Sequence, residues 1–361
     1  MSNDRLSATA RMIADSADRL FAQGAKEEAQ EGAWDAALWD RLVEAGISEA
    51  LALTLIEDAG DEDRLGREGA LNLLFVAGQH AAPVPLAEHA VASWLAERAG
   101  LSLPAGLIVP AGTDPGDRAA LDASGRLSAV LPHVPFARHA AAALVLVEGR
   151  LVVARIADAQ VAPAEAMSGE PRDALRFDAA PVEAAGQTDP AIAVRAWLAG
   201  ARAVQMAGAL DTVLRLTAGY VQERRQFGRP IAKFQAVQQA LAELGGQVAT
   251  TRAAANLIGA AFGDADAVPV LAAAKIRAGE AAGIASRIAH QAHGAIGFTR
   301  DYALQRFTRR LWSWRDDHGS EAWWARWLGL ALTDADAGRG ADALWPIVTG
   351  GLRFPIGREA A

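Results

Sequence analysis

The chain has 361 residues, no cysteine and a net charge of −8 at pH 7. The lack of cysteine excludes disulfides, thiolate nucleophiles and cysteine-based metal sites, and the acidic balance argues against general nucleic-acid binding. No apolar run approaches the roughly 18–20 residues of a membrane span, and the polar N-terminal stretch lacks a signal-peptide core. We therefore expect a cytoplasmic protein with no membrane span, and its length predicts two or three domains.

The first segment, residues 1–105, has the apolar periodicity of helices. Stretches at 8–22, 34–47 and 87–100 return apolar residues every three or four positions. Pro83 and Pro85 interrupt the pattern before the third stretch. We expect an N-terminal helical domain in which helix packs on helix.

The second segment, residues 106–187, consists of short apolar runs separated by turn signals. The runs GLIVPAG and ALVLVEGRLVVARI are rich in β-branched residues, and TDPGD, ASG and VEGR are typical of turns. VEGR between two apolar runs predicts a hairpin. We expect a small, abbreviated and mostly antiparallel β domain here.

The third segment, residues 188–361, returns to long helical patterns rich in alanine and leucine. Three of them, each longer than the roughly 11–12 residues of a typical helix, favour an antiparallel four-helix bundle closed by a tryptophan-rich tail. The fold class predicted for the whole chain is mainly α with a small β domain.

Two turns of this bundle have sequences that suit a ligand as well as a simple helix end. In ERRQFGRPIAKFQ, from Glu223 to Gln235, the paired arginines suit a helix C-terminus, and Arg224 also offers a planar fork to a phosphate. In QAHGAIGFTRDY, from Gln291 to Tyr302, the glycines suit a helix cap or the close approach of a ribose or pyrophosphate. The spacing of His290 and His293 does not complete a metal ligand set, so we predict no metal.

The tail has a charged cluster, WRDDHGSE at 314–321, among five tryptophans. Tryptophan stripes of this kind more often fill a core or a subunit interface than hold a cofactor. The acids of the cluster are either solvated loop residues in weak ion pairs or part of a site.

Together, RRQFGRPIAKFQ, QAHGAIGFTRDYALQRFTRR and the α, β, α order resemble the acyl-CoA dehydrogenase family of flavoenzymes. The resemblance is specific over residues 195–330 and weak in the middle segment. It implies an N-terminal helical domain, a β domain and a C-terminal four-helix bundle, with FAD at a subunit interface of a dimer or tetramer. It also implies α,β-dehydrogenation of an acyl-CoA and electron transfer to an electron-transfer flavoprotein.

The resemblance assigns cofactor contacts to both turns. Arg224 corresponds to the family arginine that meets the flavin pyrophosphate across the interface, and Phe227 and Gln235 correspond to its neighbours in the motif. Gln291, Gly294 and Gly297 correspond to the Q-x-x-G-G-x-G segment along the ADP part, in which Ala295 replaces the second glycine. The family's TEPxxGSD-like loop and Trp-Ile-Thr/Ser segment are not found between residues 105 and 150, so we expect an abbreviated β domain or a flavin ring held by other groups.

The family's catalytic glutamate lies 27 positions beyond the motif glutamine and precedes Gly-Thr. His318 stands 27 positions after Gln291, followed by Gly319 and Ser320. The resemblance also makes Ser320 a candidate cofactor contact. A second group of the family takes its glutamate from the preceding helix, where this chain has Leu198 and Ala199 instead.

Three alternatives for the catalytic base remain open. His318 takes the proton, a neighbouring acid such as Asp317 or Glu321 takes it, or this chain supplies no base. The first functional hypothesis is an FAD-dependent acyl-CoA dehydrogenase of fatty acid or sterol side-chain degradation, either a homo-oligomer or one subunit of a heteromer with a paralogue. The second is a non-catalytic scaffold of the same fold that binds no flavin.

Overall fold

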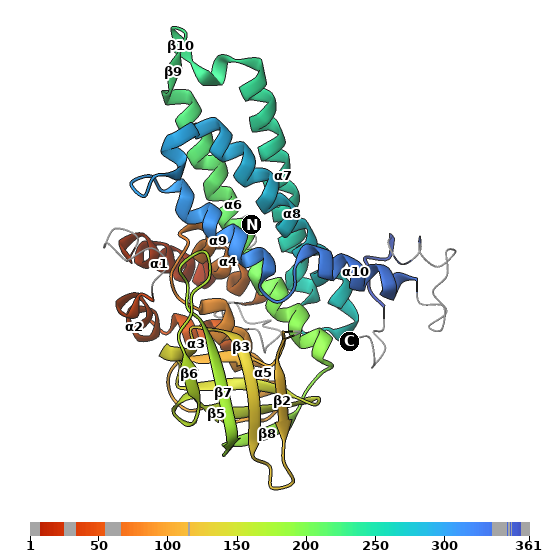
Figure 1. Cartoon of the computed structure of the whole chain (residues 1–361). Coiled ribbons are helices and arrows are strands. Elements are labelled where there is room, and N and C mark those ends of the chain that lie inside the picture. Colours follow the sequence, from red (N-terminus) through yellow and green to blue (C-terminus); the bar gives the residue numbers. More distant parts are fainter. Residues whose placement is uncertain are drawn as a thin grey trace.

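The computed structural model describes residues 8–24, 34–54, 66–114, 116–333, 345, 347 and 349–354. Helices lie at both ends of this part of the chain, and the strands of two sheets lie between residues 108 and 187 (Figure 1). The predicted class, mainly α with a small β region, is confirmed. The division into three domains at residues 105 and 187 stays a prediction.

The described helices before the strands are α1 (Ala8–Gly24), α2 (Ala36–Glu44), α3 (Ile47–Thr54), α4 (Gly66–Gln79) and α5 (Leu86–Arg98). The periodic stretch at 34–47 is interrupted because Gly46, with φ +67°, takes a left-handed conformation between α2 and α3. Helix α4 is buried at every position from Gly69 to Gly78. A helix covered on all sides has no polar face, so its sequence lacks an amphipathic stripe.

The described strands form two four-stranded sheets in the orders β1-β4-β5-β8 and β2-β3-β7-β6. They are β1 (Ile108–Ala111), β2 (Arg118–Leu121), β3 (Leu127–Pro135), β4 (Ala142–Val147), β5 (Arg150–Arg155), β6 (Gln160–Ala162), β7 (Arg172–Ala180) and β8 (Ala184–Gln187). Within these sheets β1 pairs parallel with β4 and the other pairs are antiparallel. The predicted hairpin is present: Glu148 and Gly149, with φ +46° and +76°, connect β4 to β5.

The C-terminal bundle is built on α6 (Ala191–Glu223), α7 (Gln235–Ala261) and α8 (Val268–His293). Helices α9 (Leu304–Asp316) and α10 (Glu321–Leu332) pack on α8, and α9 also packs on α6. The turn from α6 to α7 contains the two-stranded hairpin β9 (Arg225–Gln226) and β10 (Arg229–Pro230). This hairpin lies at the end of the molecule opposite the sheets (Figure 1).

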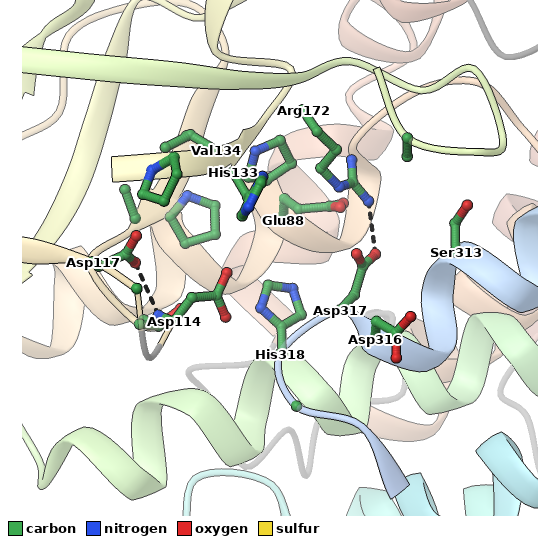
Figure 2. Close-up of a pocket in the computed structure, with 18 of the residues that line it drawn as sticks. Glu88, Asp114, Asp117, His133, Val134, Arg172, Ser313, Asp316, Asp317 and His318 are labelled. Atoms are coloured by element: carbon green, nitrogen blue, oxygen red, sulfur yellow. Dashed lines mark hydrogen bonds and ion pairs between the residues drawn. The ribbon is translucent and has the colours of Figure 1, made fainter. Parts of the chain in front are cut away.

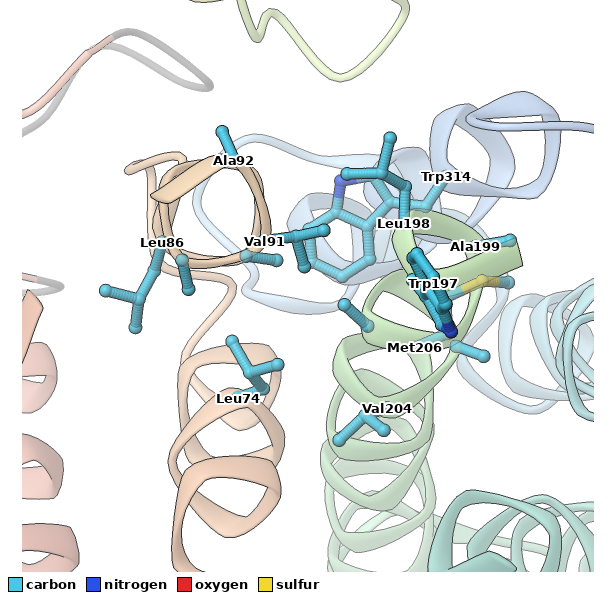
Figure 3. Close-up of a cluster of buried hydrophobic side chains, with 14 of the residues drawn as sticks. Leu74, Leu86, Val91, Ala92, Trp197, Leu198, Ala199, Val204, Met206 and Trp314 are labelled. Atoms are coloured by element: carbon cyan, nitrogen blue, oxygen red, sulfur yellow. The ribbon is translucent and has the colours of Figure 1, made fainter. Parts of the chain in front are cut away.

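Helices α4 and α6 cross with their backbones in contact. A Cβ added at Gly208 would lie 2.0 Å from the carbonyl oxygen of Phe75, and one added at Gly78 would lie 2.0 Å from that of Gln205. Only glycine permits this approach. Beside the crossing, buried side chains of α4, α5, α6 and α9, including Trp197 and Trp314, form one apolar core (Figure 3), which fixes the bundle against the N-terminal helices.

Candidate functional site

A cavity of about 730 Å³ lies where the strands meet the turn between α9 and α10. Its walls come from the loop after β1, the end of β3, the loop before β7, and the α9–α10 turn (Figure 2). This volume is within the range of roughly 300–1,000 Å³ that small-molecule pockets occupy. Three of the predicted site residues, Asp317, His318 and Ser320, line it.

The α9–α10 turn has a fixed backbone. His318 and Gly319 take positive φ angles of +58° and +104°, and the Ser320 side chain caps α10 by accepting from the Trp323 amide at 3.3 Å. Lys275 of α8 donates to the Arg315 and Gly319 carbonyls at 2.6 and 2.9 Å. These bonds hold the turn in place beneath the cavity.

Asp317 is the centre of a buried ion-pair network. Its carboxylate meets Arg172 of β7 at 2.7 Å and Arg202 of α6 at 3.1 Å, and Arg202 also pairs with Glu88 of α5. Burial alone would raise the pKa of Asp317, but the charges of Arg172 and Arg202 outweigh it and hold the pKa far below its usual range. Asp317 therefore stays ionised and is a weak proton acceptor near neutral pH.

His318 points into the cavity with its side chain almost fully enclosed. The residue is 8% exposed, and no described group forms a hydrogen bond with its Nδ1. Burial lowers the pKa of the imidazole to about 3, although the charge of Asp317 partly opposes this. Near neutral pH the ring is uncharged and carries one N–H.

The loop after β1 lines the opposite wall and was not identified as a site from the sequence. Thr113, Asp114, Gly116 and Asp117 all border the cavity. Burial, followed by the charge of Asp117, raises the pKa of Asp114 to about 6. The signal in the sequence is the turn TDPGD after the first strand. This loop is shorter than the TEPxxGSD pattern of the family and therefore does not match it.

Glu321, the third predicted catalytic candidate, is not one of the residues that line the cavity. Its carboxylate pairs with Arg315, and both residues are partly buried. Burial raises the pKa of Glu321, but hydrogen bonding to Arg315, a backbone hydrogen bond and the charges of Arg315 and Lys275 together outweigh it, and the net pKa is lowered. Glu321 thus links the last turn of α9 to the first turn of α10.

The turn from α6 to α7, with the residues on either side of it (224–235), is called the tip below. The predicted contacts Arg224, Phe227 and Gln235 lie there, and all three are exposed. Phe227 is 90% exposed and has a positive φ of +51°. Its ring meets that of Phe234 edge-on, with centroids 6.0 Å apart. The structure therefore brings these three residues together, at a place separate from the cavity.

Gln291 and Gly294 line a second hollow of about 560 Å³ at the end of α8, together with Ala295. Gly297 is buried beneath it, where an added Cβ would lie 3.0 Å from the His293 Cβ, so its place in the fold is one of close packing. The hydroxyl of Tyr220 in α6 donates to the His293 carbonyl at 3.3 Å. This bond joins the helix that leads to the tip with the end of α8 that forms the hollow.

The tryptophans of the tail divide between core and cavity. Trp314, Trp324 and Trp327 are buried, whereas Trp312 and Trp323 border the cavity. His290 meets the Thr308 hydroxyl at 2.8 Å. In the described part of the chain, no group of three or more His, Asp or Glu side chains could hold a metal ion, and no helix there is long and apolar enough to span a membrane.

The bundle and the α9–α10 turn lie largely within a recognised family region, whereas most of the residues that line the cavity precede it. Residues 195–319 match the family model for the acyl-CoA dehydrogenase C-terminal domain. Among curated proteins, the chain is 34% identical over 157 residues to 3-sulfinopropanoyl-CoA desulfinase of Paraburkholderia xenovorans, covering 41% of this chain and 40% of that protein. It is 32% identical over 197 residues to acyl-CoA dehydrogenase IpdE2 of Mycobacterium tuberculosis, covering 49% and 56%. The chain thus spans about half the length of these relatives or less.

Solved structures extend the similarity to nearly the whole chain. The Tcur3481-Tcur3483 steroid ACAD has a TM-score of 0.78 and 26% identity, covering 91% of this chain and 98% of that one. Butyryl-CoA dehydrogenase from Megasphaera elsdenii has a TM-score of 0.73 at 16% identity, with 92% and 100% covered, which shows the shared fold. The chain therefore carries an acyl-CoA dehydrogenase C-terminal domain over residues 195–319, and its described residues have the fold of solved acyl-CoA dehydrogenases.

Proposed function

We propose that this protein is an FAD-dependent acyl-CoA dehydrogenase that removes hydrogens from the α and β carbons of an acyl-CoA thioester and acts as one subunit of a hetero-oligomer. The observation that carries this proposal is the cavity between the β region and the α9–α10 turn, in a chain with this C-terminal domain. The turn that lines the cavity contains the position where the family has its catalytic base.

The residues present fit FAD in two separate places. Arg224, Arg225 and Arg229 are exposed at the tip, and guanidinium groups suit a pyrophosphate. The hollow at Gln291 and Gly294 is close to the helix that leads to the tip, and it would hold the adenosine part. We assign the cofactor contacts Arg224, Phe227, Gln235, Gln291 and Gly294 on this basis.

The cavity by itself suits a ring system and a thioester better than a pyrophosphate. Trp312, Trp323, Pro132 and Pro135 give it flat apolar walls, and Arg172 is the single arginine among its lining residues. Because the phosphate-binding side chains and the cavity lie in different parts of the fold, we propose that each FAD spans two protomers. When bound, FAD supplies the acceptor for the β-hydrogen as hydride.

The remaining chemistry belongs to this chain. The turn from Asp317 to Ser320 would lie against the thioester head. The enclosed walls would exclude water from the α carbon, and a group of the cavity would take the α-proton. Electrons would then pass to an electron-transfer flavoprotein.

A hetero-oligomer is favoured over a homo-oligomer by the residues at the base position. His318 is neutral there, and Asp317 is held by two arginines, so the family's usual carboxylate base has no equivalent at this position of the turn. The steroid ACAD to which this chain is similar bears a two-component name. In such an assembly a paralogous subunit would share the flavin with this chain through the cofactor contacts offered by this tip.

Purification of the chain alone and after co-expression with a neighbouring homologue tests the proposal. We expect visible flavin absorbance in the co-expressed complex, bleaching on anaerobic addition of an acyl-CoA, and an enoyl-CoA product by mass spectrometry. A colourless complex would refute the dehydrogenase and favour the scaffold of the same fold.

A further inference from the structure

Two side chains face each other across the cavity in environments that shift their proton affinities in opposite directions. Asp114 lies on the loop after β1, and His318 lies on the α9–α10 turn (Figure 2). We propose that Asp114 takes the α-proton of the bound acyl thioester, while the His318 imidazole donates a hydrogen bond to the thioester oxygen. This inference rests on the proposed function, since it assigns the proton step of the same reaction.

His318 has the properties of a hydrogen-bond donor to a developing negative charge. The Trp324 indole donates to its carbonyl oxygen at 3.0 Å, and Lys275 fixes the adjoining Gly319 carbonyl. The ring therefore projects from an immobilised backbone, with Nδ1 left free of any described hydrogen bond. Asp317, Arg202, Lys275 and Arg172 face it, and the three cations among them help to keep the ring uncharged.

A neutral imidazole with a strongly lowered pKa is a weak base, but its N–H stabilises an enolate without first having to lose a proton. Such donors, already in place before the reaction, act where charge develops in the transition state. Nδ1 is enclosed and has no partner among the described groups, so Nε2 is the ring nitrogen from which a ligand in the cavity would accept a hydrogen bond. The thioester oxygen of a bound acyl-CoA would be that acceptor.

Asp114 has the properties of a proton acceptor. Its amide donates to the Asp117 carboxylate at 2.9 Å, and the Asp117 amide donates to the Asp114 carbonyl at 3.0 Å, so the loop is closed on itself. The structure shows no hydrogen bond from a described side chain to the Asp114 carboxylate. Asp117 on its own loop, Arg195 of α6, His133 of β3 and Asp317 are the charged or titratable groups that face it.

Two other acids that line the cavity are less suited to this task, because arginines hold their carboxylates. Asp317 is held by Arg172 and Arg202, and Glu88 is held by Arg202. A general base works best when its pKa lies near the working pH, and the two arginines hold the pKa of Asp317 far below it. Two titratable groups whose environments separate their pKa values in this way suit complementary roles.

The proton transfer from the α carbon to Asp114 needs no reactant beyond the acyl thioester and the two side chains. The Cα–H bond breaks, the proton bonds to the Asp114 carboxylate, and the electron pair moves to the carbonyl to give an enolate whose oxygen accepts from His318. No oxidant is consumed. If the β carbon cannot lose hydride, the proton returns to the α carbon, and in heavy water a deuteron returns instead.

Exchange of the α-hydrogen is therefore the test, and it requires no turnover of the flavin. The co-expressed complex is incubated in heavy water with a 3-thia-acyl-CoA, which has sulfur at the β position, and deuterium is counted by mass spectrometry. We expect Asp114→Asn to slow exchange by about 100-fold or more and His318→Ala by about 100-fold. Asp178→Asn, at an exposed acid of β7 outside the cavity, is the matched control and should keep the wild-type rate.

The pH profile separates a chemical role from a structural one. Asp114 must be ionised to accept a proton, so wild-type exchange should rise with pH, with a midpoint near the pKa of about 6, and then level off. Asp114→Glu, which keeps a carboxylate, should retain measurable exchange, and His318→Gln, which keeps an N–H donor, should lose less than His318→Ala.

Binding of the thia-acyl-CoA, measured by calorimetry, distinguishes the possible failures. If Asp114→Asn binds the ligand and exchanges at the wild-type rate, the assignment of Asp114 is wrong, while flavin bleaching by the wild type would leave the proposed function standing. If the wild-type complex binds no acyl-CoA, both the proposed function and this inference are wrong.

Discussion

Replacing Asp317 by asparagine tests whether the α9–α10 turn is fixed by its ion pairs. The substitution keeps the size of the side chain and removes its charge, leaving Arg172 and Arg202, which are 8% and 3% exposed, without one of their anions. Breaking a buried pair costs about 3–5 kcal/mol. Arg202 keeps Glu88 and Arg172 keeps the Pro171 carbonyl, so we expect the lower end of this range, about 3 kcal/mol.

Urea unfolding followed by tryptophan fluorescence measures this loss in free energy of unfolding. Asp189→Asn is the matched control, because the pair of Asp189 with Arg98 has side-chain exposures of 26% and 39% and should contribute at most about 1 kcal/mol. The pKa of Asp317 is lower in the folded state than its unfolded-state value of about 3.9. The ion pairs of Asp317 therefore stabilise the fold fully at pH values above the unfolded-state pKa, and this stabilisation is lost as the pH falls toward the folded-state pKa. The difference between wild type and variant should therefore be full at pH 7 and shrink in acid. A loss below about 1 kcal/mol at pH 7, no larger than that of a surface pair, would refute the reasoning.

Three further changes test other parts of the structure. Gly208→Ala should prevent correct packing of α4 on α6 and give little folded protein by circular dichroism. The control Gly219→Ala, with open space around its Cβ position, should raise the free energy of unfolding by up to about 1 kcal/mol. Equal behaviour of the two variants would contradict the close crossing of the helices. Lys275→Met should lower the free energy of unfolding in urea by about 2 kcal/mol or more, because the carbonyls of Arg315 and Gly319 lose their donor. The control Lys233→Met, at the surface, should lower it little. Similar losses in the two variants would refute the role of Lys275 in the turn. Phe227→Ala should leave the free energy of unfolding within about 0.5 kcal/mol of wild type but lower the flavin content of the co-expressed complex, measured by absorbance. An unchanged flavin content would exclude the tip from the cofactor site.

The helices and the hairpin could be predicted from local patterns. The spacing of apolar residues predicted α1, α5 and the long bundle helices. In α1 the buried residues Ala10, Ala14, Ala17 and Phe21 follow the helical period, so its buried face is visible in its own sequence. Helix α4 has no such stripe, since it is buried on every side. The hairpin at Glu148 and Gly149 was predictable because a two-residue turn depends only on its neighbours.

The site was predictable only in part. The register from Gln291 to His318 placed the α9–α10 turn at the cavity, and the turn does line it. Asp114 could not be assigned from the sequence, because the loop after β1 is shorter than the family's TEPxxGSD motif. Its raised pKa depends on burial and on Asp117, Arg195 and His133, which come from its own loop, α6 and β3.

The sequence by itself determined most of the elements, their order and the likeness to acyl-CoA dehydrogenases, because helix periodicity, turn chemistry and contiguous motifs are local properties of a chain. Tertiary structure alone decided the protonation of Asp317 and His318 within WRDDHGSE. Asp317 is ionised because α5, α6 and β7 bring Glu88, Arg202 and Arg172 together, and His318 is neutral because the fold removes water from it. Proton affinity depends on burial and on charges within a few ångströms, and residues distant in sequence supply both.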